Sequence, residues 1–396
     1  MRKILAGLEV APDNRGLLAV INFAFFTSGI MAIMLGVLLP YIRAEYSLSY
    51  TQSGLMFSGH QLGNFCAVLA AGVLPYVLGR KKSTLLMGAG TALGLILIVA
   101  AQNPWLLMIA FILTGIGRGT MSNICNVVIA DISGNRAVAL NVLHSVFATG
   151  ALISPVIVFL YVSAIGASGW KPAALTAASL AIIALALISR SKLPDTPAQK
   201  DKDSSRAFLK KSSFWIPTLL LLCYLAVETS IIGWFVTYFI DVGILPAVVA
   251  GFVPAMFWLM MMTGRLSVAF ISKRIQNKNR MLLTMALLTT FCFIGLMLSG
   301  SPIPTVIFLL GIGLGMAGIY PTTMATMSGI TSTVSVGFTV AIASLGGIFM
   351  PGIVGAVADS HGIANGIAML LSMLIGMVAL VILKIITERR VRNETC

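Results

Sequence analysis

The chain has 396 residues, of which 58% are hydrophobic and only 10% are charged, and its mean hydropathy is +0.99. A soluble globule of this composition would have too few polar side chains to cover its surface, so an ordinary soluble domain is excluded and a bilayer protein is indicated. The formal net charge of +14 is not accompanied by a basic module interleaved with aromatic residues, so we expect no nucleic-acid partner.

Charged and Gly/Pro-rich points divide the sequence into twelve mostly apolar runs, each long enough for the roughly 20 residues of a spanning helix. We expect helices at 17–42, 49–79, 83–101, 104–131, 137–165, 172–190, 214–241, 246–272, 280–300, 302–329, 333–358 and 362–385. The first run is too long for the core of a cleaved signal peptide, so we expect this helix to be retained. The sequence thus predicts an all-α membrane protein with 12 transmembrane helices.

The positions of Lys and Arg predict the orientation, because short cytoplasmic loops hold an excess of both. With the N-terminus inside, 22 of the 26 basic residues fall in cytoplasmic segments. Of the other four, Arg43 and Lys171 fall outside, and Arg118 and Arg265 fall within helices. We therefore expect both termini in the cytoplasm, a location in the cytoplasmic (inner) membrane, and basic loops that face an anionic leaflet.

The cysteines show no spacing typical of a metal site or a disulfide framework. Cys66, Cys125, Cys223 and Cys292 lie singly within apolar runs, and Cys396 is the last residue. The loops are mostly too short for a domain, and they contain no phosphate-binding loop, paired carboxylates or nucleophile–base pattern. We therefore predict no enzyme activity, no catalytic residues, no metal and no cofactor.

The longest polar interval, 191–213, contains prolines, serines, lysines and aspartates and reads as a cytoplasmic linker. It separates an N-terminal half, 1–190, from a C-terminal half, 214–396, that ends in a short cytoplasmic tail. This organisation predicts two six-helix bundles.

An internal repeat supports the two halves. Shifting the sequence by 196 residues places Gly115–Gly119 on Gly311–Gly315 and Gly150 on Gly346. The offset is nearly constant across several helix pairs and close to half the chain, as a parallel duplication of six helices would leave it.

The architecture and these residues resemble the major facilitator superfamily over the whole chain. The loop signature of that family has a degraded match at Gly72–Lys81, where Tyr76 and Val77 stand in place of Asp and Arg. Three stretches resemble the fucose and hexose proton symporter branch, namely Leu140–Ser145 with Gly150 and Pro155, Glu228–Tyr238 and Gly315–Ala325. The resemblance implies alternating access, a sugar-like solute and protons as the coupling ion.

The acids of that branch in the first and fourth helices are absent here. Gly36 occupies the first position, and Thr120 or Met121 the second. The resemblance therefore does not identify fucose as the solute.

Three ionisable residues lie within apolar runs, where charge is costly and usually faces a protein interior or a watery pathway. Glu228 lies roughly 20 Å along its helix from Asp241, and its carboxyl group could carry the coupling proton or pair permanently with an arginine. Arg118 and Arg265 could bind an anionic or hydroxyl-rich solute through a planar guanidinium, or form internal ion pairs. Two arginines and one glutamate favour a polar, perhaps anionic, solute.

Further candidates are weaker, and helix–helix contact or packing explains each of them equally well. The candidates for substrate binding are Asn126, His60, Gln61, Asn64, Trp234, Tyr238, Trp258 and Tyr320. Two residues could take part in proton coupling: His144 could titrate near neutral pH, and Tyr224, one turn before Glu228, could orient its carboxyl group. Asp359 and His361 are interpreted only as the end of the eleventh helix.

The sequence favours a secondary active transporter for a small polar solute, a sugar or sugar acid, that acts as a monomer in the lipid bilayer, and we expect proton symport. An organic-anion exchanger is the alternative transport mechanism. A membrane sensor built on a transporter fold is the alternative from another class, and it would need a partner that docks on the linker.

Overall fold

The computed structural model describes residues 9–194, 207–271, 277–327 and 333–394. The long helices of the first half are α2 (Arg15–Glu45), α3 (Tyr50–Ala71), α5 (Arg80–Ala100), α6 (Pro104–Ile132), α7 (Arg136–Ile165) and α8 (Trp170–Arg190). Those of the second half are α9 (Ser212–Val242), α10 (Ala247–Ile271), α11 (Lys278–Leu298), α12 (Pro302–Met316), α14 (Thr333–His361) and α16 (Leu370–Glu394). Shorter helices are η1 (Pro12–Asn14), α4 (Leu74–Leu78), η2 (Ala167–Gly169), η3 (Ala207–Lys210), α13 (Ile319–Ala325) and α15 (Ile363–Ala368).

The fold is all-α, as the sequence predicts. Within the described ranges, 11 helices are long and apolar enough to cross a membrane, so this is a multi-pass membrane protein. The predicted second span, α3, does not count among them although its 22 residues would extend about 33 Å. Its polar residues His60, Gln61 and Asn64 lower its mean hydropathy.

The helix boundaries repeat along the chain as the predicted duplication requires. Helix α2 begins at Arg15 and α9 at Ser212, and α3 begins at Tyr50 and α10 at Ala247, so both pairs lie 197 residues apart. The packing repeats as well, because α2 lies against α7 as α9 lies against α14, and α5 against α6 as α11 against α12. Each half therefore builds the same set of helix contacts.

Three predicted spans are interrupted, and a proline explains two of the breaks. The third break, in the run 362–385, separates α15 from α16 at Met369. The run 49–79 is wrong as a single helix, because α3 ends at Ala71 and α4 follows after a turn. The run 302–329 is also divided, into α12 and α13. Proline has no N–H and clashes with the carbonyl four residues earlier. Pro75 lies four residues after the end of α3, and Pro321 lies five residues after the end of α12.

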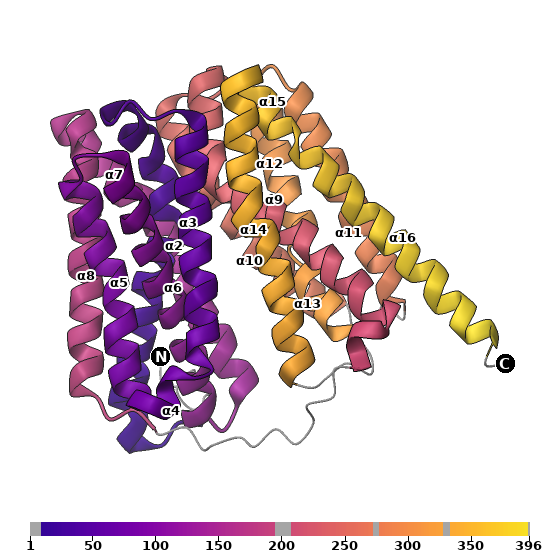
Figure 1. Cartoon of the computed structure of the whole chain (residues 1–396), viewed down its shortest axis with the longest axis horizontal. Coiled ribbons are helices and arrows are strands. Elements are labelled where there is room, and N and C mark those ends of the chain that lie inside the picture. Colours follow the sequence, from indigo (N-terminus) through magenta and orange to yellow (C-terminus); the bar gives the residue numbers. More distant parts are fainter. Residues whose placement is uncertain (1–8, 195–206, 272–276, 328–332, 395–396) are drawn as a thin grey trace. The chain divides into compact units, whose positions relative to one another are not determined.

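Contacts divide the chain into two compact units. The first unit comprises Met1–Leu48 and Leu55–Gln199, and the second comprises Ser49–Gly54 and Lys200–Cys396. Figure 1 shows most helices of the first unit in indigo and magenta and those of the second in red, orange and yellow. The first turn of α3 thus belongs to the second unit. The predicted linker 191–213 falls largely outside the described residues.

Glycines allow the principal helix pairs to approach closely inside each unit. A Cβ on Gly150 of α7 would lie 2.1 Å from the backbone oxygen of Phe26 in α2. The equivalent Gly346 of α14 would place a Cβ 2.1 Å from the backbone oxygen of Leu222 in α9. These repeated glycines therefore serve contacts within a unit.

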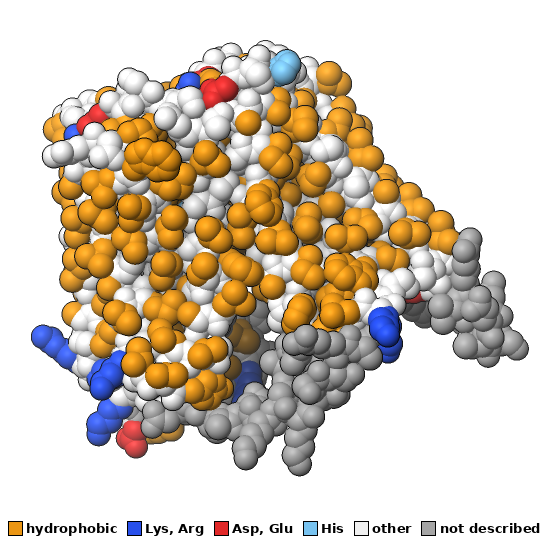
Figure 2. All heavy atoms as spheres, in the orientation of Figure 1, with side chains coloured by type: hydrophobic (Ala, Val, Ile, Leu, Met, Phe, Trp, Pro, Cys, Tyr) orange, Lys and Arg blue, Asp and Glu red, His pale blue; other side chains and the backbone are white. Residues whose placement is uncertain are grey.

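The surface has the pattern of a protein in lipid. Figure 2 shows hydrophobic side chains along the flanks of the helices and most of the visible Lys and Arg side chains at the lower edge of the view.

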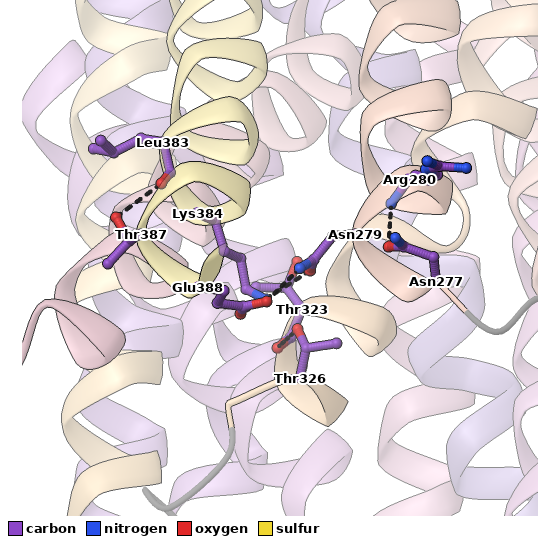
Figure 3. A network of polar contacts seen from close by, with 9 residues as sticks. All are labelled: Asn277, Asn279, Arg280, Thr323, Thr326, Leu383, Lys384, Thr387 and Glu388. Atoms are coloured by element: carbon purple, nitrogen blue, oxygen red, sulfur yellow. Dashed lines mark hydrogen bonds and ion pairs between the residues drawn. The ribbon is translucent and has the colours of Figure 1, made fainter. Parts of the chain in front are cut away.

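Two basic residues that the sequence places in cytoplasmic segments are nevertheless buried. Arg80, at the start of α5, forms an ion pair of 2.9 Å with Asp131 of α6. Lys384 contacts Asn279 and Glu388 at the ends of α11 and α16, as Figure 3 shows.

Candidate functional site

The second unit holds a carboxylate on a spanning helix. Glu228 lies midway along α9 and is half-buried. The hydroxyl of Tyr224, one turn earlier, donates a hydrogen bond of 3.2 Å to its Oε1 atom. Tyr224 is buried, so the hydrogen bond orients the carboxyl group from the interior side. The expected pairing of these two residues is present.

An arginine from the next helix approaches the same tyrosine. Arg265 of α10 interacts with the hydroxyl of Tyr224. Its guanidinium carbon lies 5.8 Å from the ring centroid of Trp258, a distance at which a cation is attracted to an aromatic face. The Nε atom of Arg265 is buried and has no hydrogen-bond partner among the described residues. This donor is therefore available to a polar ligand.

A third helix segment completes this group. Tyr320, on α13, has its ring centroid 5.8 Å from that of Tyr224, and the charges of Glu228 and Arg265 both act on it. The break before Pro321 separates α13 from α12 and gives Tyr320 a position that a continuous helix would not. We call Tyr224, Glu228, Trp258, Arg265 and Tyr320 the polar cluster.

Two other aromatic candidates lie away from this cluster and are buried in protein. Trp234 and Tyr238 are six and ten residues after Glu228, roughly 9 and 15 Å along α9. The indole of Trp234 donates to the backbone oxygen of Pro351 at 3.1 Å. Tyr238 packs against the rings of Phe235 and Phe239. The contacts of both residues match a packing role.

In the first unit, Arg118 is half-buried and lines a small cavity among α2, α5, α6 and α8. The cavity also has the hydroxyl-bearing residues Thr27, Ser28 and Thr91 in its wall. Ser28 Oγ is buried without a hydrogen-bond partner among the described residues. Arg118 therefore has polar surroundings of its own, which the sequence pattern does not reveal because they come from two other helices, α2 and α5.

The polar residues of α3 pack on α6. His60 Nδ1 lies 2.9 Å from Thr114 Oγ1, and the charge of Arg118 acts on the His60 ring. A Cβ on Gly119 would lie 2.8 Å from Asn64 Oδ1. Gln61 is half-buried. His60 and Asn64 thus lie at a helix–helix contact next to Arg118.

The last two candidates have local contacts. Asn126 donates through Nδ2 to the Ser122 backbone oxygen at 2.7 Å, one turn earlier on α6. His144 is exposed on α7, and its ring meets Phe25 edge to face with centroids 5.3 Å apart. Both residues belong to the first unit, and these contacts lie within it.

One interpretation is wrong. Asp359 does more than end a helix, because both of its carboxylate oxygens accept hydrogen bonds from backbone N–H groups at the start of α3. No sequence pattern predicts this contact, because Asp359 and the N–H groups of Tyr50 and Thr51 lie more than 300 positions apart.

Comparison with known proteins identifies the family. The profile of the Major Facilitator Superfamily matches residues 21–332. Bypass of stop codon protein 6 from Saccharomyces cerevisiae is 21% identical over 381 residues, which is 86% of this chain and 76% of the yeast protein. The gallate transporter of Pseudomonas putida is 27% identical over 162 residues, 40% of this chain and 35% of that protein.

Solved structures share the fold over nearly the whole length. A bacterial homologue of the human lysosomal transporter Spinster, in an inward-facing and occupied conformation, aligns with a TM-score of 0.74 at 15% identity and covers 94% of this chain and 97% of its own. A D-xylose–proton symporter aligns with a TM-score of 0.72 at 15% identity, over 93% and 96% of the two chains. The chain therefore belongs to the Major Facilitator Superfamily and is a membrane transporter rather than an enzyme.

Proposed function

We propose that this protein is a proton-coupled symporter for a small polar solute, a sugar acid or another hydroxylated carboxylate, which it moves by alternating access. Both termini lie in the cytoplasm in this proposal, and the protein acts as a monomer in the inner membrane. Glu228 carries the proton, Arg265 binds the solute's anionic group, and Arg118 is a further candidate for contact with the solute.

The observation that carries the proposal is the pairing of a half-buried carboxylate with a guanidinium through Tyr224. Charges within spanning helices are costly and usually mark pathways for ions or solutes. Glu228 can exist with or without its proton while Tyr224 keeps it oriented. A solute carboxylate that binds Arg265 would compete with Glu228 for the same positive charge and favour protonation of Glu228, which couples the two events.

The chemistry of Arg265 supports an anionic solute. Its Nε donor is buried and unsatisfied among the described residues, and a guanidinium binds carboxylates through paired, charge-assisted hydrogen bonds. The aromatic rings of Trp258 and Tyr320 can pack on a sugar or an aromatic ring. The relatives support both chemistries, since one is named for gallate and one neighbour for D-xylose and protons.

Replacement of Glu228 by Gln tests the proposal in proteoliposomes. The amide keeps the shape of the side chain but cannot exchange a proton. We expect uptake driven by a pH gradient to disappear, while exchange of labelled for unlabelled solute persists. The matched control is Asp13→Asn, an exposed acid before α2, which should transport normally. Unchanged proton-driven accumulation in Glu228→Gln would exclude Glu228 as the proton carrier.

A competition screen identifies the solute class. Sugar acids and small carboxylates should displace a bound radioligand at lower concentrations than neutral sugars of the same size. The advantage should vanish in Arg265→Gln. If a neutral hexose outcompeted every acid, the anionic part of the proposal would be wrong.

Arg265 also supports a second candidate, an exchanger of organic anions. In that mechanism the transporter changes between its inward-facing and outward-facing states only when a solute neutralises the guanidinium of Arg265. Uptake would then require solute inside the vesicle and would not respond to a pH gradient. The same proteoliposome assay separates the two mechanisms.

A further inference from the structure

The start of α3 is held by a carboxylate from a distant helix. Asp359, in the last turn of α14, accepts the backbone N–H of Tyr50 through Oδ1 at 2.8 Å and that of Thr51 through Oδ2 at 2.7 Å. The first turn of α3 contains no acidic residue of its own. The N–H groups of a first helical turn have no partner within the helix, and a negative charge there also interacts favourably with the helix dipole. Ser49 Oγ already accepts the N–H of Gln52, so Asp359 extends this cap to the N–H groups of Tyr50 and Thr51.

A second carboxylate binds the same turn through a side chain. The hydroxyl of Tyr50 donates to Asp241 Oδ2 at 2.8 Å, at the end of α9. The ring of Tyr50 lies 6.1 Å from that of Trp234, whose indole is fixed on the Pro351 carbonyl. The first turn of α3 thus touches both α9 and α14 through polar groups and an aromatic ring.

The backbones in this region pack without room for a methyl group. A Cβ on Gly54 of α3 would lie 2.4 Å from the carbonyl oxygen of Pro351, and a Cβ on Gly355 of α14 would lie 2.3 Å from that of Tyr50. This fit accounts for the assignment of Ser49–Gly54 to the second unit, whereas the rest of α3, from Leu55, belongs to the first.

We propose that Asp359 and Asp241 form a latch that holds the first turn of α3 on the second unit and that is released during each transport cycle. The inference rests on the proposed alternating access, in which the part of α3 that belongs to the first unit moves with that unit. A docked first turn would then resist the movement until its hydrogen bonds break. Both aspartates are therefore gating residues.

The chemistry of these contacts is that of a reversible closure. Asp359 and Asp241 are both exposed, so water can replace their partners when the turn leaves. Carboxylate-to-backbone bonds at a helix start are strong enough to favour the docked state, but they bury no charge. Asp359 binds the backbone N–H groups of residues 50 and 51 and also interacts with the hydroxyls of Ser49 and Thr51, whereas Asp241 depends on the hydroxyl of Tyr50.

A cysteine at Ser53 reports on release of the turn. Ser53 is fully buried, and its hydroxyl bonds to the carbonyl oxygen of Ser49 in the same turn, so Ser53→Cys is a small change. The exposed native Cys66 is replaced by Ser in the background. Intact cells are treated with a membrane-impermeant maleimide, and the rate of labelling at position 53 is compared between variants without added solute.

Asp359→Asn should raise the labelling rate about threefold to thirtyfold, the range expected for loss of a helix cap. Asn can accept from only one of the two N–H groups at full strength, and it carries no charge. Tyr50→Phe, which removes only the bond to Asp241, should give a smaller increase and is a mild change that leaves the backbone bonds intact. Ser360→Ala, next to Asp359 but bonded only within its own region of α14, is the control and should leave the rate unchanged.

A labelling rate in Asp359→Asn equal to that of Ser360→Ala would overturn the latch. So would an increase of the same size in Ser360→Ala, because the turn would then be sensitive to any change at the end of α14. The measurement requires neither solute nor protons. If the proposed proton coupling proves wrong, the latch is still tested, and failure of the latch leaves the Glu228→Gln experiment unaffected.

Discussion

Lys384 shows how a single charge can be retained inside a helix bundle. Its ammonium group is buried, yet Nζ lies 2.6 Å from Glu388 Oε1 and 2.8 Å from Asn279 Oδ1. Asn279 in turn donates through Nδ2 to the other oxygen of Glu388, so the three residues form a closed network between α11 and α16, as Figure 3 shows. A buried charge of this kind is stable only while its partner remains.

This network predicts an asymmetry between its two charged members. Glu388→Ala leaves the buried ammonium of Lys384 without its carboxylate, and we expect a loss of about 1–3 kcal/mol in the free energy of unfolding, less than for a fully buried pair because Glu388 is half exposed. Lys384→Met removes the buried charge and keeps most of the apolar contact, so its effect should be smaller. Thermal unfolding in detergent measures both.

The exposed Arg389, which follows Glu388 on α16, provides the control for this comparison, since Arg389→Ala should change stability little. If Lys384→Met were the more destabilising of the two changes, the contribution of Lys384 would be packing of its alkyl chain rather than the charged network.

Charged residues of this protein differ in how well the sequence predicts their contacts. Glu228 and Arg265 stand out because they interrupt apolar runs, and the spacing of Tyr224 and Glu228 by one helical turn predicts their contact correctly. The charge pattern assigns Lys384 to a cytoplasmic segment. Its burial depends on packing against α11, which the pattern does not show. Asp359 is bonded to backbone atoms more than 300 residues away, which no side-chain pattern can encode.

Among the elements, α3 and α6 pack backbone to backbone, because glycines without side chains lie at their contact. A Cβ on Gly115 would lie only 1.9 Å from the carbonyl oxygen of His60, and one on Gly63 would lie 2.1 Å from that of Ile112. The two backbones therefore touch directly. This contact keeps His60 against Thr114 and close to Arg118.

Gly115→Ala should separate these helices. The new methyl group has backbone as its neighbour, which cannot rotate away, so we expect a loss of about 1–3 kcal/mol of stability. We also expect weaker solute binding, because the helix of Arg118 must shift. Melting temperature in detergent and radioligand binding measure the two effects.

Gly251→Ala is the matched control for Gly115→Ala. It lies within α10, where a Cβ would meet nothing within 4 Å, so the change should be neutral or stabilise the helix by up to about 1 kcal/mol. If both changes lowered the melting temperature equally, the close approach of α3 and α6 would not be the cause.

The elements themselves were largely readable from hydropathy, since the apolar runs predicted every long helix. The positions at which helices are interrupted are harder to predict. Pro75 and Pro321 end the preceding helix, whereas Pro40, Pro155, Pro217, Pro254 and Pro351 lie inside continuous helices. A proline's effect depends on whether neighbouring helices support the segment on both sides, and that is a property of the packing.

At the scale of the whole molecule, the two halves share a pattern of helices but not of charges. The repeated helix starts and helix pairs show the common scaffold. The polar cluster belongs to the second unit, while Arg118 stands where the second half has Leu314. In the proposed mechanism, function therefore depends on the residues that break the repeat.

The count of spanning helices decides the topology of the whole chain. With α3 as a span, twelve crossings return the chain to the side on which it began, and the loop before α3 and the turn after it face opposite sides. If α3 did not span the membrane, the loop before α3 and the turn after it would face the same side. The glycine contacts of α3 with α6, in the middle of α3, favour a helix that runs beside α6 through the bilayer.

Two single cysteines test this topology in intact cells. Ala44→Cys, exposed near the end of α2, should react with a membrane-impermeant maleimide added outside, whereas Val73→Cys, exposed after α3, should react only after permeabilisation. Gly300→Cys, in the short exposed turn between α11 and α12, is the control and should behave like Ala44→Cys, because the repeat and the basic loops place both on the outer side. Equal labelling of positions 44 and 73 from outside would remove α3 from the spans, and with it the assignment of both termini to the cytoplasm.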